Sequence, residues 1–157
     1  MVSILDFFRP ARAAEGASGA AKVFPVEKSD IDWRKVLSPE QYRVLRQHGT
    51  ERPGSSPLEH DPRVGTFYCA GCGNRLFRSD TKFDSGCGWP SFFEAVPGAT
   101  ETTADNSLGM RRVEVHCSRC GGHLGHIFND GPAPTGNRFC MNGVAMKFQA
   151  DDKGRAS

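Results

Sequence analysis

The stretch MRRVEVHC, residues 110–117, decides the fold class, because it has the pattern of one extended strand. Successive side chains of a strand point to opposite faces. One face carries Arg111, Val113, Val115 and Cys117, and the other carries Met110, Arg112, Glu114 and His116. RFCMNGVAMKF, residues 138–148, alternates likewise, and from Val64 onward Gly and Pro separate such short runs. The sequence therefore predicts a mainly β domain.

Helix signals precede the β region. In SPEQYRVLRQHG, residues 38–49, Ser38 is expected as the N-cap, Pro39 as the first helical residue, Gln41 as the partner in a capping box and Gly49 as the stop. A shorter helical turn is expected in SDIDWRKVL, residues 29–37, with Trp33, Val36 and Leu37 on its apolar side. We expect both segments to be scaffold that packs on the β domain.

Length and charge limit the classes of protein. A chain of 157 residues is long enough for one domain with a core and short for two. A formal charge of +2 does not favour a nucleic-acid or membrane surface, and no run of 18 apolar residues predicts a spanning helix. We expect no nucleic-acid partner, no membrane partner and a monomer.

The chain is expected to divide into three parts. Residues 1–28, rich in Ala, Gly and Ser, are interpreted as a disordered arm, residues 29–150 as a single domain and residues 151–157 as a tail. MVSILDFFRPARA at the start could be the remnant of an export or transit leader, but Asp6 and Arg9 interrupt its short apolar part. A cytoplasmic location is the expectation.

Two matched cysteine motifs predict a metal site. CAGCG (69–73) and CSRCG (117–121) both have the form C-x-x-C-G, in which one tight turn can aim two thiolates at a point. Four thiolates form a closed tetrahedral shell typical of structural zinc, which leaves no position for a catalytic water. A thioredoxin-like redox pair or two disulfides are alternatives, but the matched turns favour metal. The proposed ligands are Cys69, Cys72, Cys117 and Cys120.

The spacing of these motifs is unusual. Between Cys72 and Cys117 lie 44 residues, against about 15 to 20 in a compact zinc ribbon. The metal is therefore expected to clamp two distant segments around an inserted piece of structure, and that insert contains Cys87.

Cys87 and Cys140 remain after the four ligands are removed. Arg138, Cys140 and Asn142 are expected on one face of a strand, continued by Val144, Met146 and Phe148. A nearby guanidinium would favour the Cys140 thiolate. Cys87 lies between Gly86 and Gly88, an accessible position next to Trp89. This pair of thiols suits thiol–disulfide exchange, in which Cys140 attacks and Cys87 resolves.

The segment GGHLGHIFNDGP, residues 121–132, supplies candidate acid–base groups. His123 and His126 lie three residues apart and Asp130 follows four further on, so two imidazoles and an orienting carboxylate could meet at one site. A role in turns or in supporting hydrogen bonds is the alternative.

The ordered motifs together are similar to those of a known family. C-x-x-C, SGCGWPSF, the second C-x-x-C, HLGHIFNDGPAPTG and RFCMN resemble the B-type methionine sulfoxide reductases, over roughly residues 38–148. The resemblance implies two antiparallel β-sheets with added N-terminal helices, one structural zinc ion and no organic cofactor. It implies reduction of the R epimer of methionine sulfoxide in proteins, possible action on the free amino acid, and repair of oxidised proteins with thioredoxin as reductant.

The resemblance also implies roles for single residues. Cys140 would be the nucleophile and Cys87 the resolving thiol. The polar side of the pocket would contain His126 as the acid, with His123 and Asn142 ordering the site and Asp130 or Arg138 tuning its charge. Trp89 and Phe139 would contact the substrate. Family members commonly have NSAS where this chain has Asn142-Gly143-Val144-Ala145.

Two other classes compete with an enzyme. A zinc-ribbon binding module for nucleic acid or protein explains the four-cysteine motif but gives Cys87 and Cys140 no role. A zinc-stabilised redox sensor would use both thiols without turnover.

Overall fold

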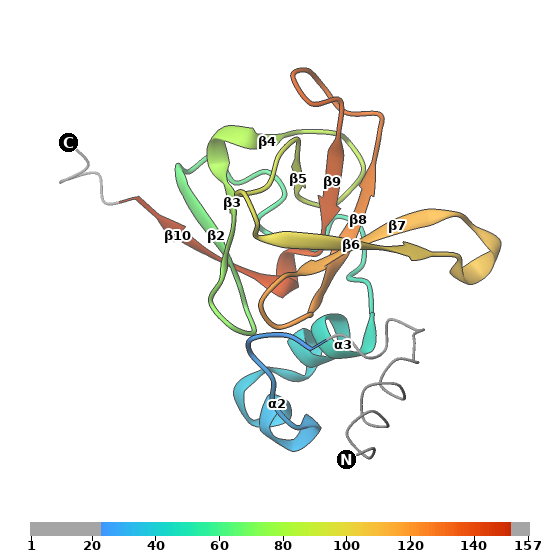
Figure 1. Cartoon of the computed structure of the whole chain (residues 1–157). Coiled ribbons are helices and arrows are strands. Elements are labelled where there is room, and N and C mark those ends of the chain that lie inside the picture. Colours follow the sequence, from blue (N-terminus) through green and yellow to red (C-terminus); the bar gives the residue numbers. More distant parts are fainter. Residues whose placement is uncertain (1–22, 152–157) are drawn as a thin grey trace, which may run out of the picture.

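Two antiparallel sheets form most of the computed structural model, which describes residues 23–151 apart from the side chain of Leu108 (Figure 1). The first sheet has the strand order β10-β2-β3, with β10 at Met146–Ala150, β2 at Gly65–Cys69 and β3 at Arg75–Arg78. The second has the order β4-β5-β9-β8-β7-β6. Its strands are β4 Lys82–Phe83, β5 Ser91–Phe92, β6 Thr100–Asp105, β7 Arg112–Cys117, β8 His123–Phe128 and β9 Arg138–Met141. The predicted pair of antiparallel sheets is confirmed.

The core lies between the two sheets and contains a cluster of phenylalanine rings. Phe77 of β3 stacks on Phe92 of β5 with ring centroids 4.3 Å apart, and Phe67 of β2 meets the same ring at 5.0 Å. Phe139 of β9 packs edge-to-face on Phe77 and is buried. Phe139 therefore belongs to the core, whereas the sequence placed it among the residues expected to contact substrate.

Two helices pack on this β structure, α2 at Asp30–Val36 and α3 at Pro39–Gln47. The capping box is confirmed, since the Ser38 hydroxyl accepts from the Gln41 amide at 3.1 Å and the Gln41 side chain accepts from the Ser38 amide at 2.8 Å. Helix α3 stops one residue earlier than expected, at His48, which is left-handed with φ 57°.

The apolar side of the first helix differs in part from the prediction. Trp33 and Leu37 are buried, but Val36 is 57% exposed. Trp33 faces the β domain and is covered by the Arg46 guanidinium, 4.4 Å from its ring. Val36 is the last residue of the helix, and Leu37 after it is extended. The Val36 side chain is therefore directed to solvent, while that of Leu37 is buried.

Residues 138–148 do not form one continuous strand. Strand β9 ends at Met141, a 3₁₀ turn η4 follows at Gly143–Ala145, and β10 continues in the other sheet. The turn is fixed by the Glu51 carboxylate, which accepts from the amides of Gly143 at 2.7 Å and Val144 at 3.1 Å. The predicted continuation of the reactive face through Val144, Met146 and Phe148 is therefore wrong.

The described residues at both ends of the domain are attached to it. The Val26 amide donates to the Arg119 carbonyl at 2.8 Å, and the Phe24 ring packs edge-to-face on His116, so residues 23–28 belong with the folded part. At the other end, Asp151 pairs with Arg78 through both carboxylate oxygens. The expectations for residues 1–22 of the arm and for residues 152–157 of the tail concern parts of the chain outside the described residues. None of the described helices is both long and apolar enough to cross a membrane.

Candidate active site

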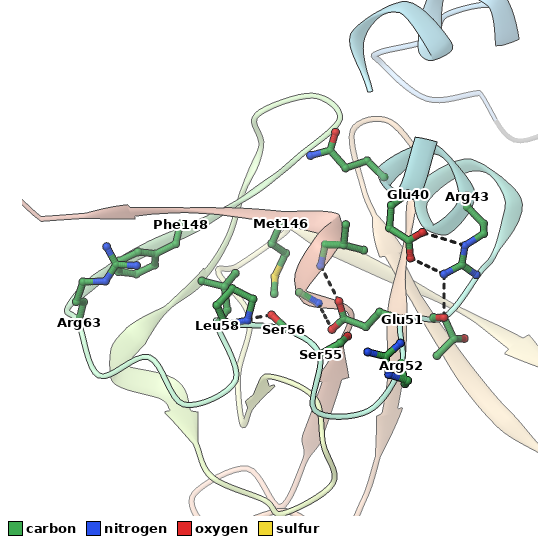
Figure 2. A pocket seen from close by; sticks show the side chains of 15 residues that line it. Glu40, Arg43, Glu51, Arg52, Ser55, Ser56, Leu58, Arg63, Met146 and Phe148 are labelled. Carbon is green, nitrogen blue, oxygen red and sulfur yellow. Dashed lines mark hydrogen bonds and ion pairs between the residues drawn. The ribbon is translucent and has the colours of Figure 1, made fainter. Parts of the chain in front are cut away.

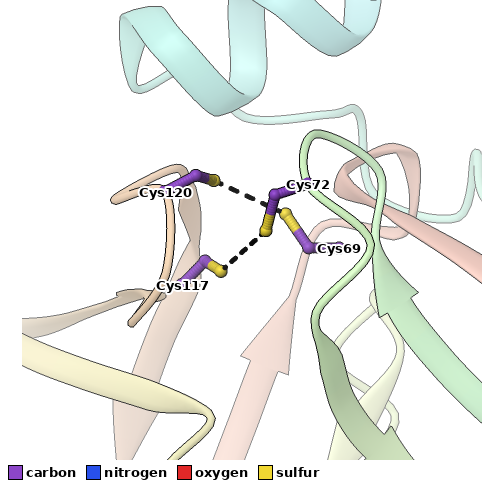
Figure 3. A group of neighbouring side chains, drawn as sticks. All are labelled: Cys69, Cys72, Cys117 and Cys120. Carbon is purple, nitrogen blue, oxygen red and sulfur yellow. Dashed lines mark hydrogen bonds between the residues drawn. The ribbon is translucent and has the colours of Figure 1, made fainter. Parts of the chain in front are cut away.

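The four paired cysteines converge from two sheets (Figure 3). Cys69 ends β2 and Cys72 lies in the turn before β3, whereas Cys117 ends β7 and Cys120 lies in the turn before β8. The Sγ atoms of Cys69 and Cys120 are 3.7 Å apart, and those of Cys72 and Cys117 are 3.6 Å apart. The motifs thus join two hairpin turns that are distant in sequence, as their spacing predicted.

The arrangement fits a tetrahedral ion. Zn–S bonds of about 2.3 Å give a regular tetrahedron with S–S edges of about 3.8 Å. All four sulfurs lie within 4.8 Å of one another. Backbone amides donate to three of them, at 3.3 to 3.4 Å, which stabilises thiolate charge. This cluster can hold a metal ion.

The two remaining thiols meet at a different place. The Sγ atoms of Cys87 and Cys140 are 3.2 Å apart, although 52 residues separate them in sequence. A disulfide needs about 2.05 Å, so bond formation requires the sulfurs to approach by only about an ångström. Gly86 and Gly88, on either side of Cys87, both have a positive φ, which favours glycine. Gly88 also packs closely on Pro53, since a Cβ at this position would lie 2.9 Å from the Pro53 side chain.

The pKa values of the two thiols are shifted in opposite directions. Burial raises the pKa of the Cys140 thiol above its usual range, the Cys87 contact acts in the same direction, and Arg138 acts against both. Burial also acts to raise the pKa of Cys87, but hydrogen bonds with Ser85, Ser91 and Cys140 lower it overall. The free dithiol therefore keeps a proton on Cys140, and the guanidinium alone does not make it a thiolate as the sequence suggested.

Cross-strand pairing places Cys140 in one row with a histidine and a serine. Cys140 of β9 pairs with His126 of β8 on one side and with Ser91 of β5 on the other. Directly paired residues of antiparallel strands present their side chains on the same face, about 5 Å apart. His126 is therefore the imidazole next to Cys140, and Arg138 lies on the same face two residues from it.

His126 and His123 each contact a carboxylate that no sequence pattern indicated. His126 Nε2 lies 2.7 Å from the Asp105 carboxylate, and His123 Nδ1 lies 2.8 Å from that of Glu114. Burial lowers the pKa of His126 below its ordinary value, although the Asp105 hydrogen bond opposes this, so the imidazole is neutral at rest. The pKa of Asp105 falls well below its usual range, with the His126 hydrogen bond as the largest cause.

Asp130 does not orient a histidine. Its carboxylate binds Arg138 Nε at 2.8 Å, and the guanidinium lies 4.4 Å over the Phe128 ring. The possible contact of Asp130 with the imidazoles is not formed, because Asp130 lies beyond the end of β8. Glu114 comes from β7, which pairs with β8, and Asp105 comes from β6, one strand further in the sheet.

A small pocket of about 90 Å³ opens over Cys140. Four of the residues expected at the site line it, together with four others. The lining comprises Cys140, His126, Trp89, Asn142, Thr50, Arg112, Gly125 and Phe128. His123 is not among them and lies buried behind His126, with ring centroids 5.5 Å apart.

Glu51 holds several residues of the pocket in place, and no sequence pattern indicated this role. Its carboxylate holds η4, as Figure 2 shows, while its backbone binds two pocket residues. The Glu51 carbonyl accepts from Trp89 Nε1 at 3.0 Å, and its amide donates to Asn142 Oδ1 at 2.9 Å. A single charged residue in a surface-like segment carries no sequence signal that it is buried, and Glu51 is only 5% exposed.

The fold and the two cysteine sites define the class of protein. Residues 37–150 match the SelR domain, and the chain belongs to this family. Relatives named peptide methionine sulfoxide reductase MsrB include one from Bradyrhizobium diazoefficiens, 58% identical over 79% of this chain and 90% of the relative. That from Agrobacterium fabrum is 57% identical over 79% and 93%. That from Methanosarcina barkeri is 54% identical over 83% and 92%. The family resemblance of the sequence motifs is confirmed.

Proposed function

We propose that this protein reduces methionine sulfoxide, of the R epimer, in peptides and proteins, and that it thereby repairs oxidised proteins. Membership of the SelR domain family and the names of its relatives support the reductase class. The observation that carries the mechanism is the 3.2 Å contact between Cys87 and Cys140 at a pocket that also contains His126.

The first step needs a nucleophile and a proton donor. A sulfoxide oxygen leaves sulfur only when it is protonated or strongly hydrogen-bonded. Cys140 is protonated at rest and His126 is neutral, so the imidazole can take the thiol proton and deliver it to the oxygen. Asp105 stabilises the imidazolium formed in between. Oxygen passes to Cys140, which becomes a sulfenic acid, and the sulfoxide is reduced to methionine.

The second step uses the neighbouring thiol. Cys87 attacks the Cys140 sulfenic acid, a disulfide forms and water leaves with the hydroxyl oxygen. The lowered pKa of Cys87 favours the attacking thiolate. An external dithiol, which we take to be thioredoxin, then reduces the disulfide and is itself oxidised.

Trp89 gives the pocket its apolar wall. Its indole is fixed by the hydrogen bond to Glu51, so it can receive the substrate methyl group while the oxygen faces His126. Separate places for methyl and oxygen would select one epimer. A pocket of about 90 Å³ takes the end of the side chain and leaves the peptide backbone outside.

The four-cysteine site fits a structural zinc ion. Cys69, Cys72, Cys117 and Cys120 would hold it, and with all four ligands from protein it would supply rigidity rather than chemistry. It lies at the turns that join the two sheets, and the reactive thiols lie elsewhere in the six-stranded sheet.

Thiol titration with R and S methionine sulfoxide, free and in peptides, tests the proposal. The wild type should lose two free thiols with the R epimer and none with the S epimer. Cys140→Ser should lose all reduction, and Cys87→Ser should complete one turnover and then stall with thioredoxin. Turnover by Cys140→Ser would refute the mechanism. Unchanged thiols in the wild type would favour a binding module, and oxidation without methionine release would favour a sensor.

A further inference from the structure

Three metal-ligating side chains from three elements converge outside the pocket. They are His48, which ends α3, Glu114 of β7 and His123 of β8. The same carboxylate oxygen, Glu114 Oε2, lies 2.8 Å from His123 Nδ1 and 3.3 Å from His48 Nε2. The imidazole rings face one another, with centroids 5.1 Å apart and a tilt of 36°. One nitrogen of each ring and one carboxylate oxygen therefore lie within 4.8 Å of one another.

We propose that His48, Glu114 and His123 form a second metal site, which binds a divalent first-row transition ion such as Zn²⁺ or Co²⁺. Two imidazoles and one carboxylate are a ligand set that suits these ions, and soft thiolates take no part in it. Three protein ligands leave positions open for water, unlike the closed four-cysteine cluster.

The distances fit such an ion without rearrangement of the backbone. Metal–ligand bonds of about 2.1 Å separate neighbouring ligand atoms by about 3.0 Å in an octahedral site and about 3.4 Å in a tetrahedral one. The observed separations of 2.8 and 3.3 Å are close to these values, and the three ligand atoms all lie within 4.8 Å of one another. A bound ion takes the lone pair of His123 Nδ1, so the neutral imidazole carries its single proton on Nε2 in the metal complex.

The site combines a rigid base with an open side. His123 is 3% exposed and Glu114 12%, so two ligands are fixed by packing, whereas His48 is 69% exposed and leaves a path from solvent. In the part of the chain that the structure describes, His48 is the one residue other than glycine with a positive φ. A left-handed residue at this helix end directs the imidazole back toward Glu114, although the flexible Gly49 stands next in sequence.

Another histidine of the chain provides a matched control. His60 is 66% exposed and also contacts two carboxylates, Glu59 at 3.5 Å and Asp84 at 3.7 Å. It does so through opposite ring nitrogens, so its imidazole lies between the two acids and the three groups cannot share an ion. A surface histidine with acidic neighbours is thus present without convergent ligands.

Cobalt titration tests the proposal. The protein is prepared with zinc in the four-cysteine site and with Cys87→Ser and Cys140→Ser, which removes the reactive thiols as competing ligands. Co²⁺ is then added and the visible absorption is followed. We expect one further Co²⁺ per chain, with bands of nitrogen and oxygen ligands and no thiolate charge transfer. H48Q and E114Q should each weaken binding at least about 10- to 100-fold, and H60Q should leave it unchanged.

The result does not depend on reductase activity, because this variant cannot turn over. Absence of bound Co²⁺ at millimolar concentration would overturn the proposal. So would unaltered affinity in H48Q, an exposed position whose replacement leaves the core intact, or equal weakening by H60Q. Thiolate charge-transfer bands would show exchange into the cysteine cluster and would also overturn it.

Discussion

Glu51 offers a sharp test of how the pocket is supported. Glu51→Ala removes the acceptor for the amides of Gly143 and Val144. A buried amide left without a partner costs about 1 to 3 kcal/mol, and Val144 is only partly buried. We therefore expect the free energy of unfolding to fall by about 2 to 5 kcal/mol. For a domain of this size each kcal/mol lowers Tm by about 2 to 4 °C.

The assay is urea unfolding followed by fluorescence and circular dichroism, with Glu40→Ala as the matched control. Glu40 lines the same wide pocket as Glu51 (Figure 2), but it is exposed and pairs with the exposed Arg43. Its loss should change stability far less. Equal stability changes in the two variants would refute the reasoning. Glu51→Ala should also raise KM, because Trp89 and Asn142 are held by the backbone of residue 51.

The contribution of Glu51 should also depend on pH. Burial raises the pKa of this carboxyl above its ordinary value, although the two amides oppose the shift. The folded state therefore binds this proton more tightly than the unfolded state. The added stability is complete below the unfolded pKa and is lost as the pH rises through the folded pKa. The difference between wild type and Glu51→Ala should be larger at mildly acidic pH than at mildly alkaline pH.

Three further predictions follow from other contacts. Gly143→Ala should destabilise by about 1 to 3 kcal/mol, because a Cβ there would lie 1.9 Å from Ser56 Oγ and 2.6 Å from Ser56 Cβ. Ser56→Gly should restore most of this loss in the double variant, and a thermal double-mutant cycle without such coupling would contradict the steric cause. Asp105→Asn should slow single-turnover sulfenic acid formation about tenfold, since an ionised partner of His126 is lost; an unaltered rate in the folded variant would show that this pair is not used. Removal of metal by a chelator should cost several kcal/mol of stability, measured by calorimetry, and a chelated protein that unfolds like the untreated one would argue against a structural ion.

Local motifs were predictable because their physical causes are local. The capping box of Ser38 and Gln41 depends on atoms three residues apart, and each C-x-x-C turn aims its own two sulfurs. The same holds for Cys140 and Arg138, which share a face of one strand. These features needed only periodicity and turn chemistry.

The partners of the histidines and the break after Met141 were not predictable in this way. Asp105 and Glu114 reach His126 and His123 only because β6, β7 and β8 pair in a particular register. The strand pattern of residues 138–148 is interrupted because Glu51, about 90 residues earlier in the chain, binds the η4 amides.

The sequence by itself determined the family and the β class. It also predicted that the four paired cysteines meet at one place and that Cys87 and Cys140 meet at another, since each feature is written in short spacings of particular residue types. Only the tertiary structure decided which carboxylate orients which imidazole, that Phe139 belongs to the core and Phe128 to the pocket, and that burial keeps a proton on Cys140. Strand register and desolvation depend on the whole packed molecule, so no local stretch of sequence contains them.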